Sequence, residues 1–142
     1  NVETMNKKVE AEINKLFVED QRAVLYLPNR LAEITQGKNF GVGFGIQNAI
    51  KTQKFRWQVL VDDDNLRRKC GVGDKEAEDW ITTGGSGSVE VPSGQNYIDI
   101  ILFNIPEGSV SDISTCIIRY KLIIKQEDGS PFITVPFDVD VS

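Results

Sequence analysis

Four consecutive polar residues, Asp62, Asp63, Asp64 and Asn65, form the densest group of oxygen ligands in this chain of 142 residues. Carboxylate and amide oxygens are the hard ligands that Ca²⁺ prefers. A calcium loop of the EF-hand type takes ligands at alternate positions and a bidentate glutamate further along, and this run has neither. The run is therefore a weak candidate for a calcium site, and a solvated turn is the competing interpretation.

A second group of carboxylates, which could pair for acid–base chemistry, follows at Asp74, Glu76, Glu78 and Asp79. Nothing in the pattern places them in a cleft, and such side chains are mostly exposed in proteins. The sequence contains no histidine, so the commonest general base and the commonest zinc ligand are both missing. Ser86 lies in a Gly/Ser run whose spacing does not fit the G-x-S-x-G motif of serine nucleophiles. We therefore predict a protein that is not an enzyme, with no catalytic residues and no cofactor.

Trp80, Tyr97 and Phe103 are aromatic residues that could point outward. Exposed aromatic rings would suit stacking on a sugar or contact with another protein. Local packing over a sheet or a loop is the alternative interpretation.

The elements that must position these residues are best defined at the end of the chain. Residues 116–125 and 132–141 alternate between apolar and polar side chains, and Asp128-Gly129 lies between them. A period of two is typical of half-buried antiparallel strands, and Asp-Gly between two such runs indicates a hairpin. Such a hairpin needs a second sheet to cover its apolar face. Further strands are predicted at 22–27 (extended by 31–35), 39–48, 55–62, 86–92 and 97–103, the last with Ile98, Ile100 and Leu102 inward.

Three glycines, Gly41, Gly43 and Gly45, share one face of the strand predicted at 39–48. The dinucleotide-binding fingerprint would need a glycine where Ile46 stands, so a phosphate loop is not indicated. Glycine in a strand often marks the close approach of another backbone or a ligand. The bare face therefore predicts a cover, which is either a helix or loop of this chain or a separate partner.

Residues 2–18 have a helical pattern, with apolar side chains at three- and four-residue spacing. These side chains are Met5, Val9, Ile13, Leu16 and Phe17. The helix either packs on its own domain or forms the lower end of a stalk that emerges from a membrane. We expect its last part, Ile13 to Phe17, to dock on the glycine face and its earlier turns to continue towards a membrane or a partner.

Composition and charge narrow the class of protein. The formal net charge of −5 argues against nucleic-acid binding, which needs a basic face. No run reaches the roughly 20 apolar residues of a membrane span. About seven strands without alternating helices predict a mainly β fold. We expect a two-sheet antiparallel immunoglobulin-like sandwich over residues 21–142. An N-terminal α-helix or stalk over residues 1–20 precedes it.

A resemblance to known modules rests on three phrases within residues 25–141, about four fifths of the chain. They are Leu25-Tyr-Leu-Pro28 with Gln36-Gly37, Val89-Glu-Val-Pro-Ser-Gly94, and Ile105-Pro-Glu-Gly108 ahead of the final hairpin. In this order they resemble the immunoglobulin-like modules of prokaryotic, particularly archaeal, cell surfaces, in the style of the CARDB and NPCBM-associated families. With a helix ahead, the layout is also similar to outward-facing domains of archaellum-associated stator proteins and of archaeal pilin-like proteins. Trp57 fits the buried tryptophan of antibody-type domains, whereas Phe44 stands where their second-strand cysteine would be.

The resemblance implies a non-enzymatic module that is exposed outside the cytoplasm. In a surface protein, Cys70 and Cys116 would usually form a disulfide. The alternative is a buried thiol at Cys116 and a free thiol at Cys70.

These inferences together predict an extracytoplasmic, cell-surface interaction or assembly module whose partner is another protein or its own copies, not a small molecule. A link to a membrane is expected only through sequence upstream of Asn1. The alternative is a carbohydrate- or calcium-binding accessory module of a cell-envelope system. The candidate interaction residues are Met5, Val9, Ile13, Gly41, Gly43, Gly45, Trp80 and Tyr97.

Overall fold

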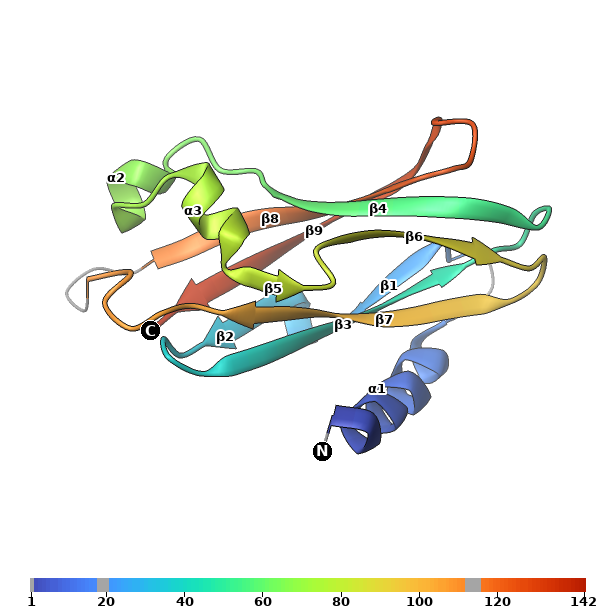
Figure 1. Cartoon of the computed structure of the whole chain (residues 1–142), viewed down its shortest axis with the longest axis horizontal. Helices are drawn as coiled ribbons and strands as arrows, with labels where there is room; N and C mark the ends of the chain where they lie inside the picture. Colours follow the sequence, from blue (N-terminus) through green and yellow to red (C-terminus); the bar gives the residue numbers. More distant parts are fainter. Residues whose placement is uncertain (1, 18–20, 112–115) are drawn as a thin grey trace.

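The computed structural model describes residues 2–17, 21–111 and 116–142, with all their side chains except those of residues 2–6 and 9. In this part of the chain, nine strands form two sheets whose apolar faces share one core (Figure 1). The strand order is β1-β3-β7-β5 in the four-stranded sheet and β2-β9-β8-β4-β6 in the five-stranded sheet. The prediction of a mainly β, two-sheet fold is confirmed, but the expected count of seven strands is too low.

The four-stranded sheet consists of β1 (Ala23–Tyr26), β3 (Asn39–Gln47), β7 (Asn96–Asn104) and β5 (Ile81–Thr83). The five-stranded sheet consists of β2 (Leu31–Ile34), β9 (Pro131–Val141), β8 (Cys116–Lys125), β4 (Gln53–Val61) and β6 (Ser86–Val91). The helices are α1 (Val2–Leu16), α2 (Leu66–Cys70), α3 (Asp74–Asp79) and the 3₁₀ turn η1 (Pro28–Arg30). Within the described ranges, none of these helices has the length and apolar character that a bilayer crossing requires.

The first predicted strand is divided between the two sheets. Pro28 interrupts it, and Asn29 and Arg30 follow with φ angles of 56° and 53°, in the left-handed region. Neither a proline nor a left-handed pair can continue a strand. The chain therefore leaves the four-stranded sheet after β1, which is antiparallel to β3, and resumes as β2, which is parallel to β9 in the other sheet.

The inward face of β7 was predicted wrongly. Ile101 and Phe103 are fully buried, whereas Ile98, Ile100 and Leu102 are half-exposed on the outer face of the sheet. Both faces of β7 are apolar because the other sheet covers the inner face and α1 contacts the outer one. The alternation of side chains along β7 therefore could not show which of its two apolar faces points inward.

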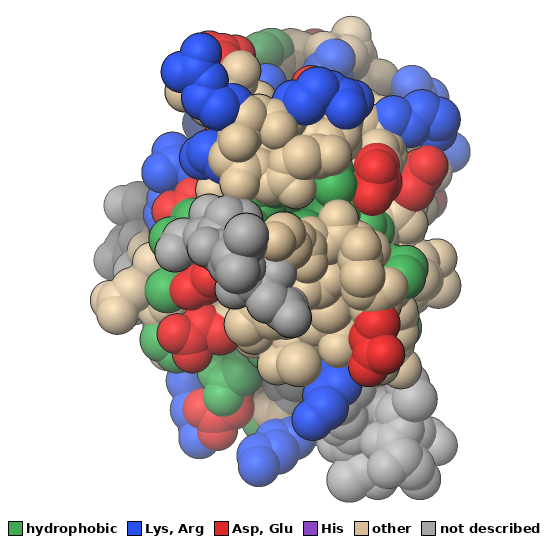
Figure 2. Space-filling model, turned by 90° about the vertical axis from the view of Figure 1, so that its left-hand side faces the viewer, with side chains coloured by type: hydrophobic (Ala, Val, Ile, Leu, Met, Phe, Trp, Pro, Cys, Tyr) green, Lys and Arg blue, Asp and Glu red, His purple; other side chains and the backbone are tan. Residues whose placement is uncertain are grey.

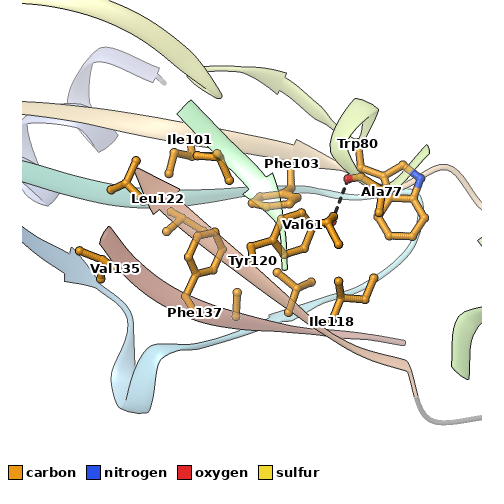
Figure 3. Close-up of a cluster of buried hydrophobic side chains, with 14 of the residues drawn as sticks. Val61, Ala77, Trp80, Ile101, Phe103, Ile118, Tyr120, Leu122, Val135 and Phe137 are labelled. Atoms are coloured by element: carbon orange, nitrogen blue, oxygen red, sulfur yellow. Dashed lines mark hydrogen bonds between the residues drawn. The ribbon is translucent and has the colours of Figure 1, made fainter. Parts of the chain in front are cut away.

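Aromatic side chains from both sheets fill the core around Tyr120 (Figure 3). The Tyr120 ring stacks on Phe137 with centroids 5.6 Å apart and meets Phe103 edge-on at 5.3 Å. Its buried hydroxyl donates a hydrogen bond of 2.8 Å to the carbonyl oxygen of Ala77 in α3. Burial, and then the charge of nearby Glu78, raise the pKa of Tyr120, so the hydroxyl stays protonated as a donor. This bond fixes α3 to the core.

The connection between β4 and β5 contains α2 and α3. A disulfide between Cys70, the last residue of α2, and Cys116, the first residue of β8, holds this connection on the sandwich, with Cα atoms 5.2 Å apart. Leu66 and Ala77 of the two helices are buried in the main core. The predicted disulfide is confirmed, and the connection forms a cap on one end of the sandwich (Figure 1).

Candidate functional site

The outer face of the four-stranded sheet carries α1, and we call the two together the helix-bearing face (Figure 1). Its centre is Gly45, where a Cβ atom would lie 2.7 Å from Cζ of Phe17 and 2.9 Å from Cγ2 of Ile13. Only glycine allows this approach, because any side chain would collide with the helix. Ile13 has no exposed surface, so the end of the helix docks through Ile13 and Phe17, whereas Leu16 of the same predicted stripe stays exposed.

The other glycines of this face differ in their surroundings. Gly43 is buried, whereas Gly41 is exposed and a Cβ atom there would lie 3.0 Å from Cγ2 of Ile100. The side chains of Met5 and Val9, which were candidates for the same surface, lie outside the described side chains. The covered part of the face is therefore centred on Gly45, towards the C-terminal end of α1.

Replacing Gly45 by valine should displace the helix. The new side chain would overlap Phe17 and Ile13, and loss of their burial should lower the free energy of unfolding by about 1 to 3 kcal/mol. Gly41→Val is the matched control, because it adds the same side chain to the same strand at an exposed position. Chemical denaturation and the helical circular dichroism signal measure the difference. Equal stability of the two variants would show that the helix does not depend on Gly45.

Apolar side chains remain exposed around the docked helix. Leu16 of α1 is 43% exposed and Tyr26 of β1 is 41% exposed. Ile98, Ile100 and Leu102 of β7 are half-exposed on the same side of the sheet, opposite the glycines of β3. An apolar surface of this kind beside a helix is typical of a protein–protein contact.

Tyr97 is not a freely exposed aromatic residue. Its ring lies 5.6 Å from that of Trp57, and its hydroxyl donates a hydrogen bond of 2.6 Å to Oδ2 of Asp99. The other carboxylate oxygen of Asp99 accepts the backbone N–H of Ile100 at 2.7 Å. Burial and the Asp99 carboxylate both raise the pKa of Tyr97, so it remains a donor. Its main contacts are therefore inside the molecule.

Of the two interpretations of Trp80 and Phe103, the structure supports local packing and not outward rings. Trp80 is 3% exposed and Phe103 is fully buried. Trp80 directly follows α3 and lies against the core near Val61 and Ala77 (Figure 3). The sequence did not show that α3 exists, so the direction of this ring could not be predicted. Neither ring is available for a sugar or a partner.

Two of the candidate calcium residues, Asp62 and Asp63, already lie near lysine side chains. Asp63 accepts a hydrogen bond of 2.6 Å from Nζ of Lys69 and a second from the backbone N–H of Asn65 at 3.0 Å. Asp62 lies 4.0 Å from the ammonium group of Lys121. The Lys69 ammonium group, in α2, also donates a hydrogen bond of 2.7 Å to the carbonyl oxygen of Ile117 in β8. Through this lysine, Asp63 connects the end of β4 to α2 and β8. Within the described residues no group of three or more acidic, cysteine or histidine side chains is placed to hold a metal ion.

Added Ca²⁺ should therefore leave the melting temperature unchanged. A ligand that binds only the folded state stabilises it by mass action, so a real site would raise the melting temperature as calcium increases. Here the Asp63 carboxylate is already held by a lysine ammonium group. Thermal melts with calcium and with a chelator test this, and a calcium-dependent rise that Asp63→Ala abolishes would contradict it.

Asp63 should also contribute to stability in a pH-dependent way. Burial raises the pKa of its carboxyl group, but the hydrogen bonds from Lys69 and from the backbone N–H groups of Asn65 and Arg119 outweigh it and hold the pKa below the usual 3.8. A lowered folded-state pKa stabilises the protein above the unfolded-state pKa of about 3.9, and this contribution disappears as the pH falls through the folded-state value. Asp63→Asn should therefore destabilise the protein at pH 7 and differ less from the parent protein below pH 3. A constant difference from pH 7 to pH 2 would contradict this.

The carboxylates of α3 are not arranged as a catalytic pair. Oε2 of Glu78 accepts the backbone N–H of Val61 at 2.9 Å, and Asp79 forms an exposed ion pair with Lys75 at 3.3 Å. Figure 2 shows this end of the molecule, where Lys and Arg side chains gather along the upper rim and carboxylates are scattered below them. Ser86 opens the regular strand β6 rather than a sharp turn. Glu78 and Asp79 therefore contact a backbone N–H and a lysine, not each other.

The sequence matches no model of a protein family, the CARDB and NPCBM-associated families included, and no curated protein. Several solved structures are similar in outline, and two of them serve as examples. A Niemann-Pick type C2 protein from Japanese carpenter ant shares 5% sequence identity over 86% of this chain and 90% of its own, with a TM-score of 0.49. A beta-glucosidase from Listeria innocua shares 12% identity over 84% of this chain but only 16% of its own, with a TM-score of 0.46. At these values neither similarity assigns a family or a ligand to this chain.

Proposed function

We propose that this chain is a non-catalytic interaction module that works outside the cytoplasm and assembles with copies of itself through the helix-bearing face. The observation that carries the proposal is the exposed apolar surface around α1, where Leu16 and Tyr26 are 43% and 41% exposed. Burying the exposed part of two such side chains would favour association by about 0.6 to 1.3 kcal/mol each.

Two further features support the proposal, one for the location outside the cytoplasm and one for the type of fold. The Cys70–Cys116 disulfide is typical of proteins in oxidising compartments, outside the cytoplasm. The order β1-β3-β7-β5 over β2-β9-β8-β4-β6, with β2 parallel to the last strand, supports an immunoglobulin-like arrangement. Phe44 and Trp57, on neighbouring positions of the facing sheets, pack with ring centroids 5.4 Å apart. In this arrangement Phe44 takes the place of a second-strand cysteine.

The alternative of a carbohydrate- or calcium-binding accessory module has less support. Trp80 and Phe103 are buried, so they cannot stack on a sugar. The Asp63 carboxylate is occupied by Lys69. No other described feature favours either ligand.

Sedimentation velocity over a concentration series tests the proposed assembly. The parent protein should associate as its concentration rises, and the double variant Leu16→Glu, Tyr26→Glu should stay monomeric. Ile50→Glu is the matched control, because Ile50 is 46% exposed but does not belong to the helix-bearing face. A parent protein that remains monomeric throughout, or equal association of all three proteins, would overturn the proposal.

A further inference from the structure

The strand β6 has a free edge, with which no other strand in the described part of the chain pairs. It is the last strand of the five-stranded sheet and pairs only with β4, from Gln53↔Val91 to Gln58↔Ser86, without a shift in register. The backbone N–H of Val59 donates to the carbonyl oxygen of Gly85 at 2.7 Å. In an antiparallel pair the bonded positions alternate, so Gly87, Val89 and Val91 also face β4. The N–H and C=O groups of Ser86, Ser88 and Glu90 therefore point away from the sheet.

The edges of β1, β2 and β5, and the uncovered ends of β7 and β4, are short, irregular or capped. The strands β1 and β2 have four residues each, and β5 has three with a shift in register. On β7, beyond β5, the carboxylate of Asp99 accepts the N–H of Ile100. At the end of β4, beyond β6, Glu78 accepts the N–H of Val61. These are common ways of preventing an edge from pairing with another chain.

The sequence of β6 contains none of these protections. Its residues Ser86 to Val91 include no proline and no lysine, and only Glu90 is charged. The side chains of Ser86, Ser88 and Glu90 are exposed, and two of the three are small. A regular six-residue edge with small side chains is a template for strand addition.

The outer face beside this edge is positively charged. Arg56 of β4 lies directly opposite Lys125 of β8 on one side and Ser88 of β6 on the other. Like charges in opposite positions are unfavourable, and neither side chain has an ion-pair partner among the described residues. A strand added next to β6 would lie two strand spacings, about 10 Å, from the Arg56 backbone. Arg56 can extend over the small Ser88 to an acidic side chain on that strand.

The inner face beside the edge is apolar. A Cβ atom on Gly87 would lie 2.5 Å from Cζ2 of Trp57, so the ring of Trp57 lies directly below this glycine. Tyr97 extends the aromatic surface, with its ring centroid 5.6 Å from that of Trp57. An inward side chain on an added strand would therefore meet aromatic carbon, which favours an apolar residue.

We propose that the free edge of β6 binds an extended segment of a partner protein, which adds a sixth strand to the β2-β9-β8-β4-β6 sheet and alternates acidic side chains on the outer face with apolar side chains on the inner face. Backbone hydrogen bonds to Ser86, Ser88 and Glu90 supply the affinity. Arg56 and the ring of Trp57 select the two kinds of side chain. This surface is separate from the helix-bearing face, so the proposed self-assembly and the strand binding can fail independently.

The probe is an acetylated, amidated octapeptide of alternating valine and glutamate, titrated into the full chain by calorimetry and followed by amide NMR shifts. Binding should shift the amides of β6 and leave those of α1 unchanged. The same peptide with lysine in place of glutamate should bind at least tenfold more weakly, because it meets Arg56. The same valine–glutamate peptide, with methyl groups on the alternate backbone nitrogens that face β6, should not bind. Equal binding of all three peptides, or shifts confined to other strands, would overturn the proposal.

Substitutions in the chain test the same edge. Ser88→Pro removes an N–H that points to solvent, which an edge strand tolerates, and should weaken binding at least tenfold. Ser88→Lys places a charge on the edge, which disfavours the addition of a strand, and it replaces the proline variant if that variant does not fold. Thr134→Lys, at an exposed position of β9 on the other side of the same sheet, is the matched control and should bind as the parent protein does. Arg56→Gln should weaken binding about threefold, the effect of one exposed ion pair.

Sedimentation of the same variants without peptide separates this proposal from self-assembly. Association lost in Leu16→Glu, Tyr26→Glu but kept in Ser88→Lys belongs to the helix-bearing face and leaves strand binding in place. Association abolished by Ser88→Lys would show that β6 pairs with a second copy of the chain, and a foreign strand would then be excluded. Peptide binding that is unchanged in both Ser88 variants would also overturn the proposal.

Discussion

Reduction of the Cys70–Cys116 disulfide should lower the free energy of unfolding by about 4 kcal/mol. The bridge joins residues 46 apart in the sequence, and in the chain-entropy model a closed loop of that length restricts the unfolded chain by about this amount. Single domains are stable by only about 5 to 15 kcal/mol, so the loss is large. Guanidinium denaturation with and without a reductant measures it.

The double variant Cys70→Ala, Cys116→Ala is the control for this prediction. It should show the same low stability as the reduced parent protein and should not respond to the reductant. Because the bridge joins α2 to the first residue of β8, the reduced protein should also lose amide protection in α2 and α3 before it does so in β4 and β8. Denaturation midpoints that do not change on reduction would contradict the prediction.

Replacing Gly84 by alanine should cost about 3 kcal/mol or more. Gly84 has φ +79°, and a Cβ atom there would lie 2.0 Å from the backbone oxygen of Ile100. The obstacle is backbone in a paired strand, so it cannot turn aside as a side chain could. The Gly84 carbonyl also accepts the indole N–H of Trp57 at 3.1 Å, so a displaced Gly84 would disturb the core.

Gly94→Ala separates the two causes of this destabilisation, the left-handed backbone conformation and the clash with Ile100. Gly94 has φ +80°, close to that of Gly84, but no atom lies within 4 Å of its Cβ position. The control should therefore show only the cost of a left-handed alanine, about 1 to 2 kcal/mol. Denaturation midpoints of the two variants give the difference. Equal destabilisation would show that the contact with Ile100 is relieved by a small movement of the chain.

Strands with one apolar face could be predicted with the correct side inward. In β8, Cys116, Ile118 and Tyr120 alternate with exposed or polar residues, and all three are fully buried. The docking of the helix could also be foreseen, because an apolar stripe and a row of glycines had no other evident partners. In both cases the pattern lies within one stretch of sequence.

Features that depend on distant contacts could not be predicted. The partners of Asp63 include Lys69, six residues away, and the backbone N–H of Arg119, which is 56 residues away. Trp80 is buried because α3 turns it into the core, and α3 is held there by Tyr120. The free edge of β6 follows from the register of the sheet, since only the register shows which backbone groups face β4.

The division of the first strand has a mechanical consequence. The strand β2 runs parallel to the last strand, with Leu31 opposite Asp138 and Ile34 opposite Val141. A pull on the two ends of the chain, once α1 and β1 have been drawn away, moves β2 and β9 in opposite directions along their length. Their hydrogen bonds are then loaded in shear and must break together rather than one after another. In a module that carries tension between two attached structures, this short parallel pair would bear the force, and stretching single molecules from both ends would measure its strength.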